Sequence, residues 1–381
     1  MRTGNSAGRI LLITRNFPPL LGGMERLNWH LAGELSKCHE VRVVGPQGAG
    51  RLAPPGVEVH EVPVRPLARF LPAAGWQTLR IARAFSPAVV LAGSGLVAPL
   101  AWTAARASGA RAAAFVHGLD ISVPNPVYQA VWPWFLRRMD RLIANSRATA
   151  ALAADAGVPA SRIGVVHPGV HLPAPDPQAR ARFRARHGLG DDPVLLSVGR
   201  FSGRKGLREF ATEVLPLISA GLPDVRLVIM GDCPANALFG QAQSPDSIRA
   251  AAEVAGTGSR LCFLGAGTDQ ELADAYSAAD VHVFPVRHIP GDPEGFGMVA
   301  IEAAAHGLPT VAYATGGVPE SVAEGLSGRL VAPGDAPGFA QAVLDLVRHP
   351  LPAAGVRGFA ERFEWTHFGA ALCAEIEACC A

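Results

Sequence analysis

Short segments rich in apolar and β-branched residues alternate with helix-forming segments, and this pattern constrains the fold of the chain more than any other feature. In the first part of the chain these segments are residues 9–14, 40–44, 57–62, 88–91 and 111–116. Each has the length of a strand, and the residues between them favour helices. Strands that alternate with helices form a parallel, doubly wound sheet. The pattern therefore predicts an α/β fold that binds its ligands beyond the carboxyl ends of the strands.

The same pattern continues beyond a proline-rich tract at residues 171–177. Before the tract, strands are also predicted at residues 141–146 and 163–167, and after it they are predicted at residues 193–198, 226–230, 260–264, 279–284 and 309–313. A chain of 381 residues is long enough for two domains of ordinary size, and the tract is typical of a linker. We therefore expect a first domain at residues 1–172 and a second at 173–362.

The most informative motif is a glycine-rich loop, residues 293–297, that opens a helix at residues 298–306. The first backbone N–H groups of such a helix have no partner within it, and they suit an anion such as a diphosphate. Glu294 lies on the loop and Glu302 lies in the helix, eight residues later. At this spacing the two carboxylates would contact different parts of an elongated ligand. The alternative interpretation is a solvated acidic helix start.

A second motif is a basic turn that follows the strand at residues 193–198. It carries Arg200 and Lys205 among glycines. Two fixed cations and exposed amides can neutralise a diphosphate leaving group without a metal. The turn is not a Walker A loop, because Arg204 stands where that motif needs glycine. The chain has no Asp-x-Asp motif, and its six cysteines lack metal-ligand spacing, so no metal is expected.

Two further motifs lie at predicted strand ends in the first domain. Gly22 and Gly23 form a turn between the first strand and a helix at about residues 26–35. His117 and Gly118 follow the fifth strand, where a doubly wound domain places site residues. The alternatives are an ordinary tight turn and a structural histidine.

Together these motifs resemble the retaining glycosyltransferases of the GT-B fold, specifically family 4. The resemblance implies two doubly wound, Rossmann-like domains facing a cleft, with a C-terminal helix at about residues 363–381 that crosses back to the first domain. It implies that Arg200 and Lys205 bind the donor phosphates, that Glu302 binds the ribose, and that Glu294 and His117 contact the donor sugar. The residues that it implies for catalysis are His117, Glu294, Arg200 and Lys205. Those for donor binding are Gly22, Gly23, Gly118, Arg200, Lys205, Glu294, Gly295, Phe296, Gly297, Met298, Val299 and Glu302. Asp120 and Phe17 are expected on the acceptor side.

Charge is distributed unevenly along the chain. Residues 1–172 carry 18 Lys and Arg against 8 Asp and Glu, whereas the remainder carries 16 against 24. A basic half favours an anionic partner, and no nucleic-acid-binding module is present, so we expect a membrane surface rather than nucleic acid. Residues 66–85 mix arginines with aromatics, as at a membrane surface, but their prolines and glycine predict a loop followed by a core-facing helix. No early apolar run is long enough for a signal peptide, which predicts a cytoplasmic enzyme, peripheral on the inner face of the membrane.

The motifs look most like those of mannosyltransferases that build glycolipids and bacterial surface polysaccharides. This resemblance implies metal-independent transfer of a hexose to a lipid-linked or glycan acceptor, with no cofactor. The donor would be GDP-mannose or a related GDP-sugar, with a UDP-sugar as the second choice. Two other functions stay open: a UDP-sugar 2-epimerase of the same fold, and a non-catalytic module that binds a nucleotide or a membrane surface.

Overall fold

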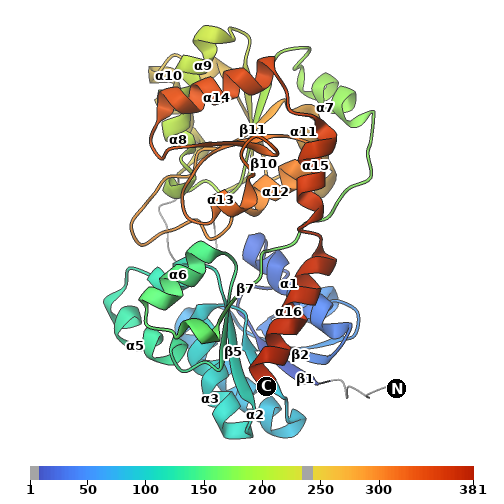
Figure 1. The fold of residues 1–381 in the computed structure, drawn as a ribbon, viewed down its shortest axis with the longest axis vertical. Coiled ribbons are helices and arrows are strands. Elements are labelled where there is room, and N and C mark those ends of the chain that lie inside the picture. The colour runs from blue at the N-terminus through green and yellow to red at the C-terminus, as the bar shows by residue number, and fades with distance from the viewer. Residues whose placement is uncertain (1–7, 234–242) are drawn as a thin grey trace. The chain divides into compact units, whose positions relative to one another are not determined.

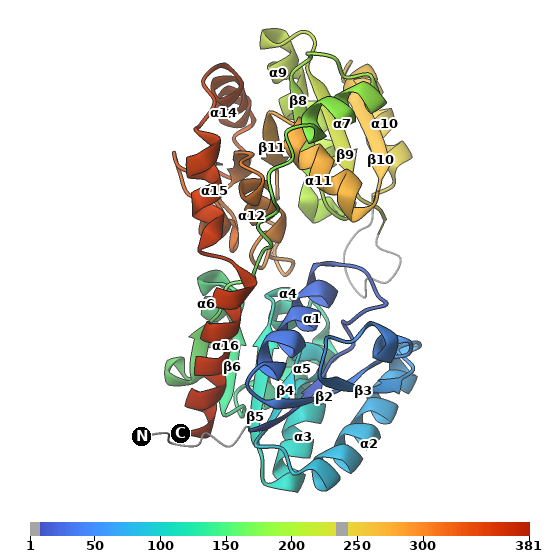
Figure 2. The same cartoon turned by 90° about the vertical axis from the view of Figure 1, so that its right-hand side faces the viewer.

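The computed structural model describes residues 8–233 and 243–381 and divides the chain into two units. Unit 1 comprises Met1–Gly169 with Trp365–Ala381, and unit 2 comprises Val170–Glu364. Each unit contains one parallel sheet with helices on both faces (Figures 1 and 2). The predicted α/β class and the two doubly wound domains are confirmed.

The sheet of unit 1 has seven parallel strands in the order β3-β2-β1-β4-β5-β6-β7. Their bounds are β1 Arg9–Ile13, β2 Glu40–Pro46, β3 Val57–Val62, β4 Val89–Ala92, β5 Arg111–Val116, β6 Arg141–Ala144 and β7 Ile163–Val165. In the register of β1, Ile10 is paired with Val41 of β2 and with Val89 of β4. The chain order reverses between β1 and β4, which is where a doubly wound sheet opens a ligand-binding crevice.

Helices cover both faces of this sheet. Their bounds are α1 Gly23–Ser36, α2 Leu67–Phe85, α3 Ala98–Ser108, α4 Leu119–Ser122, α5 Pro126–Leu136, α6 Arg147–Asp155 and α16 Trp365–Cys380, with short η1 Ala49–Leu52, η2 Gly95–Val97 and η3 Ala160–Arg162. On one face α2 lies beside α3, and α3 lies beside α5. Their alanines and Phe70 pack on alternate strand residues such as Leu11 and Val90. On the other face α1 packs against α16, and His30 stacks on Trp365 with ring centroids 3.7 Å apart.

The prediction for residues 66–85 was wrong in one respect. The structure has a single helix, α2, and Pro72 lies inside it rather than in a preceding loop. A proline inside a helix removes one hydrogen bond of the helical ladder and crowds the carbonyl four residues before it. Burial of Phe70, Ile81 and Phe85 along one face of α2 offsets that loss.

The sheet of unit 2 has six parallel strands in the order β10-β9-β8-β11-β12-β13. Their bounds are β8 Val194–Val198, β9 Arg226–Met230, β10 Leu261–Gly265, β11 Val281–Phe284, β12 Thr310–Tyr313 and β13 Gly328–Val331. The helices are α7 Ala179–His187, α8 Leu207–Glu209, α9 Leu215–Gly221, α10 Pro245–Val254, α11 Asp269–Ala278, α12 Met298–Ala305, α13 Val318–Ser321, α14 Ala336–Arg348 and α15 Ala353–Glu361, with short η4 Gly203–Lys205, η5 Phe210–Val214 and η6 Gly258–Arg260. Strand β13 was not predicted, because a four-residue edge strand that contains glycine and arginine lacks an apolar run.

The C-terminal tail contains two helices, and the second of them, α16, matches the helix expected at about residues 363–381. α15 ends at Glu361 and belongs to unit 2, whereas α16 starts at Trp365 and belongs to unit 1. α16 packs against β5 and β6, and Arg141 of β6 forms an ion pair with its Glu375 at 2.5 Å. The predicted return of the last helix to the first domain is therefore confirmed.

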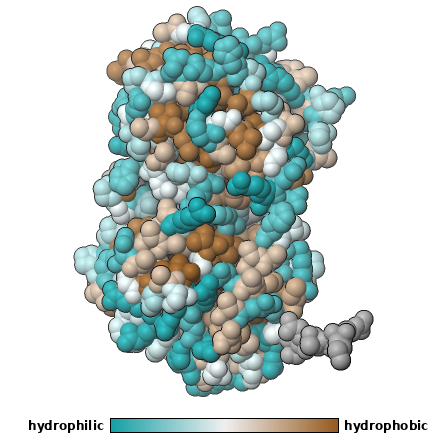
Figure 3. Space-filling view, viewed as in Figure 1, coloured by the Kyte–Doolittle hydropathy of each residue, from teal (hydrophilic) through white to brown (hydrophobic). Residues whose placement is uncertain are grey.

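The surface combines polar residues with separate hydrophobic patches on the face in view (Figure 3). Among the described residues, no helix has both the length and the apolar character needed to cross a membrane.

Candidate active site

The predicted residues of unit 2 gather where β8 and β11, neighbours in the sheet, reach their carboxyl ends. The turn after β8 carries Arg200, Arg204 and Lys205, and the loop after β11 carries Asp292 and Glu294. Parallel strands end on the same edge, which brings a turn and a loop about 90 residues apart in sequence into contact.

Gly206 fixes how closely the basic turn approaches the loop after β11. Its φ is +67°, and a Cβ there would lie 2.0 Å from the carbonyl oxygen of Pro285. In the same place the backbone N–H of Arg287 donates to the carbonyl of Arg204 at 2.8 Å. Only glycine allows both the backbone conformation and this approach.

The turn and the loop are joined by a cluster of buried charges. The Lys205 ammonium donates to Glu294 Oε2 at 2.8 Å, and Arg204 also donates to this oxygen. Arg204 Nε lies 3.1 Å from Asp292 Oδ1. Exposed fractions are 18% for the Lys205 side chain, 14% for Arg204 and 11% for Glu294. We call Arg204, Lys205, Asp292 and Glu294 the ion cluster.

The ion cluster keeps Glu294 ionised. Burial alone would raise the pKa of Glu294, but the charges of Arg204 and Lys205 outweigh burial and lower this pKa to about 2. The pKa of Lys205 is lowered, first by burial and then by the charge of Arg204, while Glu294 opposes that shift. At neutral pH the site therefore presents an ionised carboxylate beside a partly desolvated ammonium.

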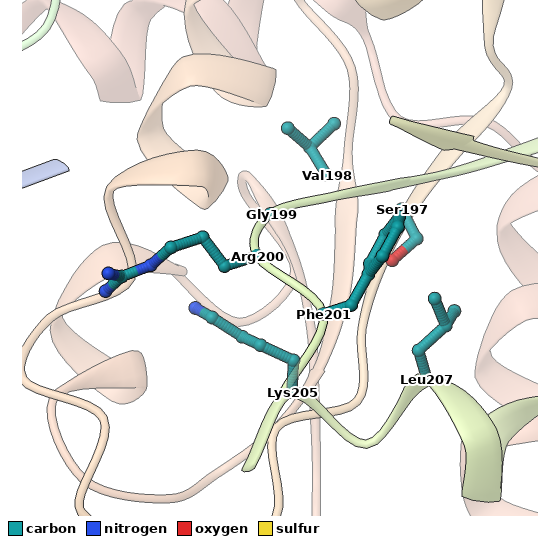
Figure 4. Close-up of a pocket in the computed structure, with 7 residues that line it drawn as sticks. All are labelled: Ser197, Val198, Gly199, Arg200, Phe201, Lys205 and Leu207. Carbon is teal, nitrogen blue, oxygen red and sulfur yellow. The ribbon is translucent and has the colours of Figure 1, made fainter. Parts of the chain in front are cut away.

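Arg200 stands apart from the ion cluster. Its side chain is exposed and makes no hydrogen bond or ion pair with a described residue. Figure 4 shows Arg200 and Lys205 extending to the same side of the turn, away from Phe201 and Leu207. The charge of Arg200 contributes to the lowered pKa of both Lys205 and Glu294, so it acts within electrostatic reach of them. Arg200 is thus a cation available to an anionic ligand.

The loop that carries Glu294 leads into helix α12 and is anchored by a backbone hydrogen bond and an aromatic contact. The backbone N–H of Gly317 donates to the carbonyl of Glu294 at 2.9 Å. Phe296 is 2% exposed and packs on Phe363, so its side chain anchors the loop. Gly297, at φ +92°, precedes α12 and supplies no side-chain cap. The first N–H groups of α12 are therefore left for another acceptor.

Glu302 lies in α12 and belongs to a different set of contacts from Glu294. Its Oε2 accepts from the Tyr276 hydroxyl at 3.2 Å, and Tyr276 stacks on His306 with centroids 5.2 Å apart. Burial lowers the pKa of His306 to about 4, helped by the charge of Arg357. The Tyr276 hydroxyl therefore orients the Glu302 carboxylate.

The predicted residues of unit 1 lie at the carboxyl ends of β1 and β5. His117 is 8% exposed, and its Nε2 lies 3.0 Å from the carbonyl oxygen of Gly93. Asp120 accepts the backbone N–H of His117 at 2.8 Å with Oδ1, and that of Gly95 at 2.7 Å with Oδ2. Both oxygens of Asp120 therefore bind the backbone and brace the loop that follows Gly118, a role not expected for an acceptor-binding residue.

The loop after β1 carries Gly22, Gly23 and Phe17. Gly22 and Gly23 lie at the start of α1, whereas Phe17 is fully buried, so the Phe17 side chain packs inside unit 1 and shows no surface to an acceptor. Near the carboxyl ends of the strands of unit 1, three buried side-chain oxygens have no hydrogen-bond partner among the described residues: Asn28 Oδ1 of α1, Ser94 Oγ after β4 and Asn145 Oδ1 after β6.

Sequence reasoning missed three residues that lie in contact with the predicted site residues or with one another. Arg204 and Asp292 could have been suspected, because each lies one or two residues from a predicted site residue. Tyr276 had no such signal, since it lies on α11 and reaches Glu302 only through the fold. No group of three or more His, Cys, Asp or Glu in the described part of the chain is arranged to hold a metal.

Residues 21–173 match the model of Glycosyltransferase Family 4, and residues 192–349 match that of Glycosyl transferases group 1. A GDP-mannose-dependent alpha-(1-6)-phosphatidylinositol monomannoside mannosyltransferase of Mycolicibacterium smegmatis is 31% identical over 379 residues, which cover 95% of this chain and 97% of the relative. The Mycobacterium tuberculosis protein of the same name is 30% identical, with 96% and 97% covered.

Two solved structures share the fold. Anabaena HepE, determined in complex with UDP-glucose, superposes with a TM-score of 0.77 at 21% identity and covers 97% of this chain and 99% of its own. WaaG, a glycosyltransferase involved in lipopolysaccharide biosynthesis, gives 0.69 at 19% identity, with 95% and 98% covered. The chain therefore belongs to glycosyltransferase family 4, and its two parallel-sheet units are those of a GT-B glycosyltransferase.

Proposed function

We propose that this enzyme transfers mannose from GDP-mannose to a lipid-linked acceptor, with retention of configuration and without a metal. The observation that carries the proposal is the basic turn at the end of β8, where Arg200 and Lys205 extend to one side beside the ionised Glu294. The choice of GDP-mannose and of a glycolipid acceptor is supported by the mycobacterial relatives, whose names specify both. We place the enzyme in the cytoplasm, peripheral to the inner face of the membrane.

Each residue of the site has a defined part in this reaction. Arg200 and Lys205 bind the diphosphate and stabilise the charge that grows on it as the bond to the sugar breaks. Glu294 accepts from hydroxyls of the donor sugar, and Glu302 accepts from the ribose hydroxyls. The uncapped N–H groups at the start of α12 add to the diphosphate contacts.

The chemical step exchanges one glycosidic bond for another. The bond between the anomeric carbon and the diphosphate oxygen breaks, and a bond to the acceptor oxygen forms on the same face of the sugar. The acceptor proton passes to the leaving diphosphate. Family resemblance supports this same-face route, and it needs no carboxylate nucleophile.

Thermal stabilisation by nucleotide sugars tests the proposal. A ligand that binds only the folded protein raises its apparent stability, so GDP-mannose should raise the Tm, with EDTA making no difference. The shift should disappear in Lys205→Ala and Glu302→Ala. The chain has two lysines, so Lys37→Ala, at a side chain 58% exposed, is the matched control, and Glu253→Ala on α10 controls for loss of a carboxylate.

The outcomes separate the remaining functions. A shift with UDP-sugars instead of GDP-sugars would replace the donor, as the UDP-glucose complex of HepE allows. Consumption of a UDP-sugar without any acceptor would indicate a 2-epimerase. No shift with any nucleotide sugar would overturn the transferase proposal and leave a binding module.

A further inference from the structure

We propose that α2, α3 and α5 of unit 1 form a docking surface for an anionic phospholipid bilayer. The inference rests on the proposed function to the extent that a lipid-linked acceptor requires the enzyme to work at a membrane. It goes further in assigning the contact to particular side chains on one face of one unit.

The same pair of residues recurs on each of these three helices. A tryptophan is followed four residues later by an arginine whose guanidinium lies over the indole: 5.2 Å for Trp76 and Arg80, 5.9 Å for Trp102 and Arg106, and 3.6 Å for Trp134 and Arg138. We call these six residues the Trp–Arg face. Because α2 lies beside α3 and α3 beside α5, the three pairs belong to one continuous helical layer (Figures 1 and 2).

The pairs on α3 and α5 are in direct contact. The rings of Trp102 and Trp134 meet edge to face with centroids 5.3 Å apart. A cation over an indole contributes modestly to stability at an exposed site. Three such pairs on neighbouring helices nevertheless make the surface of the layer amphipathic, because each indole lies beside a positive charge.

Large apolar side chains are exposed on the same layer. Trp76 is 64% exposed and Trp134 is 42% exposed. Val127 and Val131, at 68% and 41%, lie seven and three residues before Trp134, so the three line one stripe of α5. Exposed apolar residues that cluster in this way mark an interaction surface.

The positive charge of the layer formed by α2, α3 and α5 favours an anionic partner. Within α2, α3 and α5 there is no aspartate or glutamate. Arg69, Arg80 and Arg83 of α2, and Arg138 just after α5, form no ion pair with a described residue, whereas Arg106 is paired with Asp140. Unpaired arginines beside exposed indoles suit the boundary between anionic headgroups and acyl chains, where tryptophan and arginine are both favoured.

Vesicle binding tests this surface independently of catalysis. Full-length protein is expected to co-sediment with phosphatidylglycerol-containing vesicles, to bind pure phosphatidylcholine vesicles much less, and to dissociate as salt is raised. Arg80→Gln/Arg138→Gln should weaken partitioning by roughly ten- to thirtyfold. Val127→Ser/Val131→Ser should weaken it by about tenfold, through loss of the apolar contact.

Controls match each change in chemistry. Arg51→Gln/Arg348→Gln removes two exposed arginines elsewhere, and Val254→Ser replaces a 93% exposed valine on α10; neither should alter partitioning. All variants should keep the nucleotide-sugar Tm shift of the parent, so that loss of docking is distinct from loss of the donor site. Equal binding to neutral vesicles, unchanged binding of the Trp–Arg face variants, or a concentration-dependent dimer that these variants abolish would each overturn the proposal.

Discussion

The two units satisfy the polar groups at their strand ends in different ways. In unit 1, both carboxylate oxygens of Asp120 accept hydrogen bonds from backbone N–H groups, and His117 contacts a backbone carbonyl. In unit 2, Glu294 is held by the side chains of Arg204 and Lys205. The unit 1 edge is thus braced by the main chain, while the unit 2 edge depends on opposite charges.

This difference indicates that the charges of unit 2, rather than those of unit 1, would respond to an anionic ligand. Charges paired with one another in a partly buried site can exchange partners when an anionic ligand arrives, whereas carboxylates bound to backbone amides keep the loop in one shape. We therefore expect substitutions in the ion cluster to change activity first, and substitutions at the unit 1 edge to change stability first. Four predictions test this contrast, from the largest effect to the smallest.

Lys205→Ala should reduce kcat/KM for transfer by about 100- to 1000-fold, the loss typical when one fixed donor to a developing charge is removed. Lys37→Ala should leave kcat/KM unchanged, because Lys37 is exposed and its ion pair among the described residues is with Glu34. Steady-state kinetics with the donor identified by thermal shift measures both. A loss below about threefold would show that Lys205 does not bind the leaving group.

Acid should weaken unit 2 through His282, a fully buried residue of β11 that contacts Thr310 at 3.0 Å. Burial, with the charge of Lys205, lowers the pKa of His282 to about 3. The folded state therefore resists protonation, and stability present above pH 6.5 is lost as the pH falls toward 3. At pH 4.5 the loss is about 2 to 3 kcal/mol.

Urea unfolding between pH 7 and pH 4.5 measures this loss, and His282→Asn should flatten the dependence on pH. Hydrogen exchange should show the acid-induced opening in unit 2 before unit 1. An equal slope in the variant would assign the acid sensitivity to other groups.

Glu294→Gln should separate binding from transfer. Without the carboxylate, Arg204 and Lys205 lose part of their charge compensation, and we expect the free energy of unfolding to fall by about 2 kcal/mol. The same cations are then free for phosphate, so GDP should bind at least as tightly as in the parent while sugar transfer is lost. Calorimetric titration measures the affinity for GDP. Weaker GDP binding by the variant would contradict the idea that Glu294 and the diphosphate compete for Arg204 and Lys205.

Asp120→Ala should act on stability rather than on acceptor binding. It leaves the N–H groups of His117 and Gly95 without their acceptor, which costs about 1 to 2 kcal/mol. Asp120→Asn, which retains one acceptor oxygen, should recover part of the loss. An increase in acceptor KM without loss of stability would instead restore the acceptor role first expected for Asp120.

Local sequence predicted the strands well and some helices less well. β5 has the predicted bounds because an apolar run marks a buried parallel strand, and β3 has them because its valines alternate with polar residues. The start of α2 was mispredicted as a loop, because proline and glycine compete there with tertiary packing. Burial over a whole helix face outweighs one lost hydrogen bond, and no local pattern reports that burial in advance.

The sequence alone determined the two α/β units, the family resemblance and the residue types of the site, because alternating strands and helices and glycine-rich turns are local features. The tertiary structure decided which of those residues meet. Lys205 and Glu294 are 89 residues apart and pair only because β8 and β11 are neighbours in the sheet. Arg204 joins them for the same reason, while Asp120 turns to the backbone of its own loop. Strand order is set by packing over the whole chain, so a pattern read within one segment does not contain it.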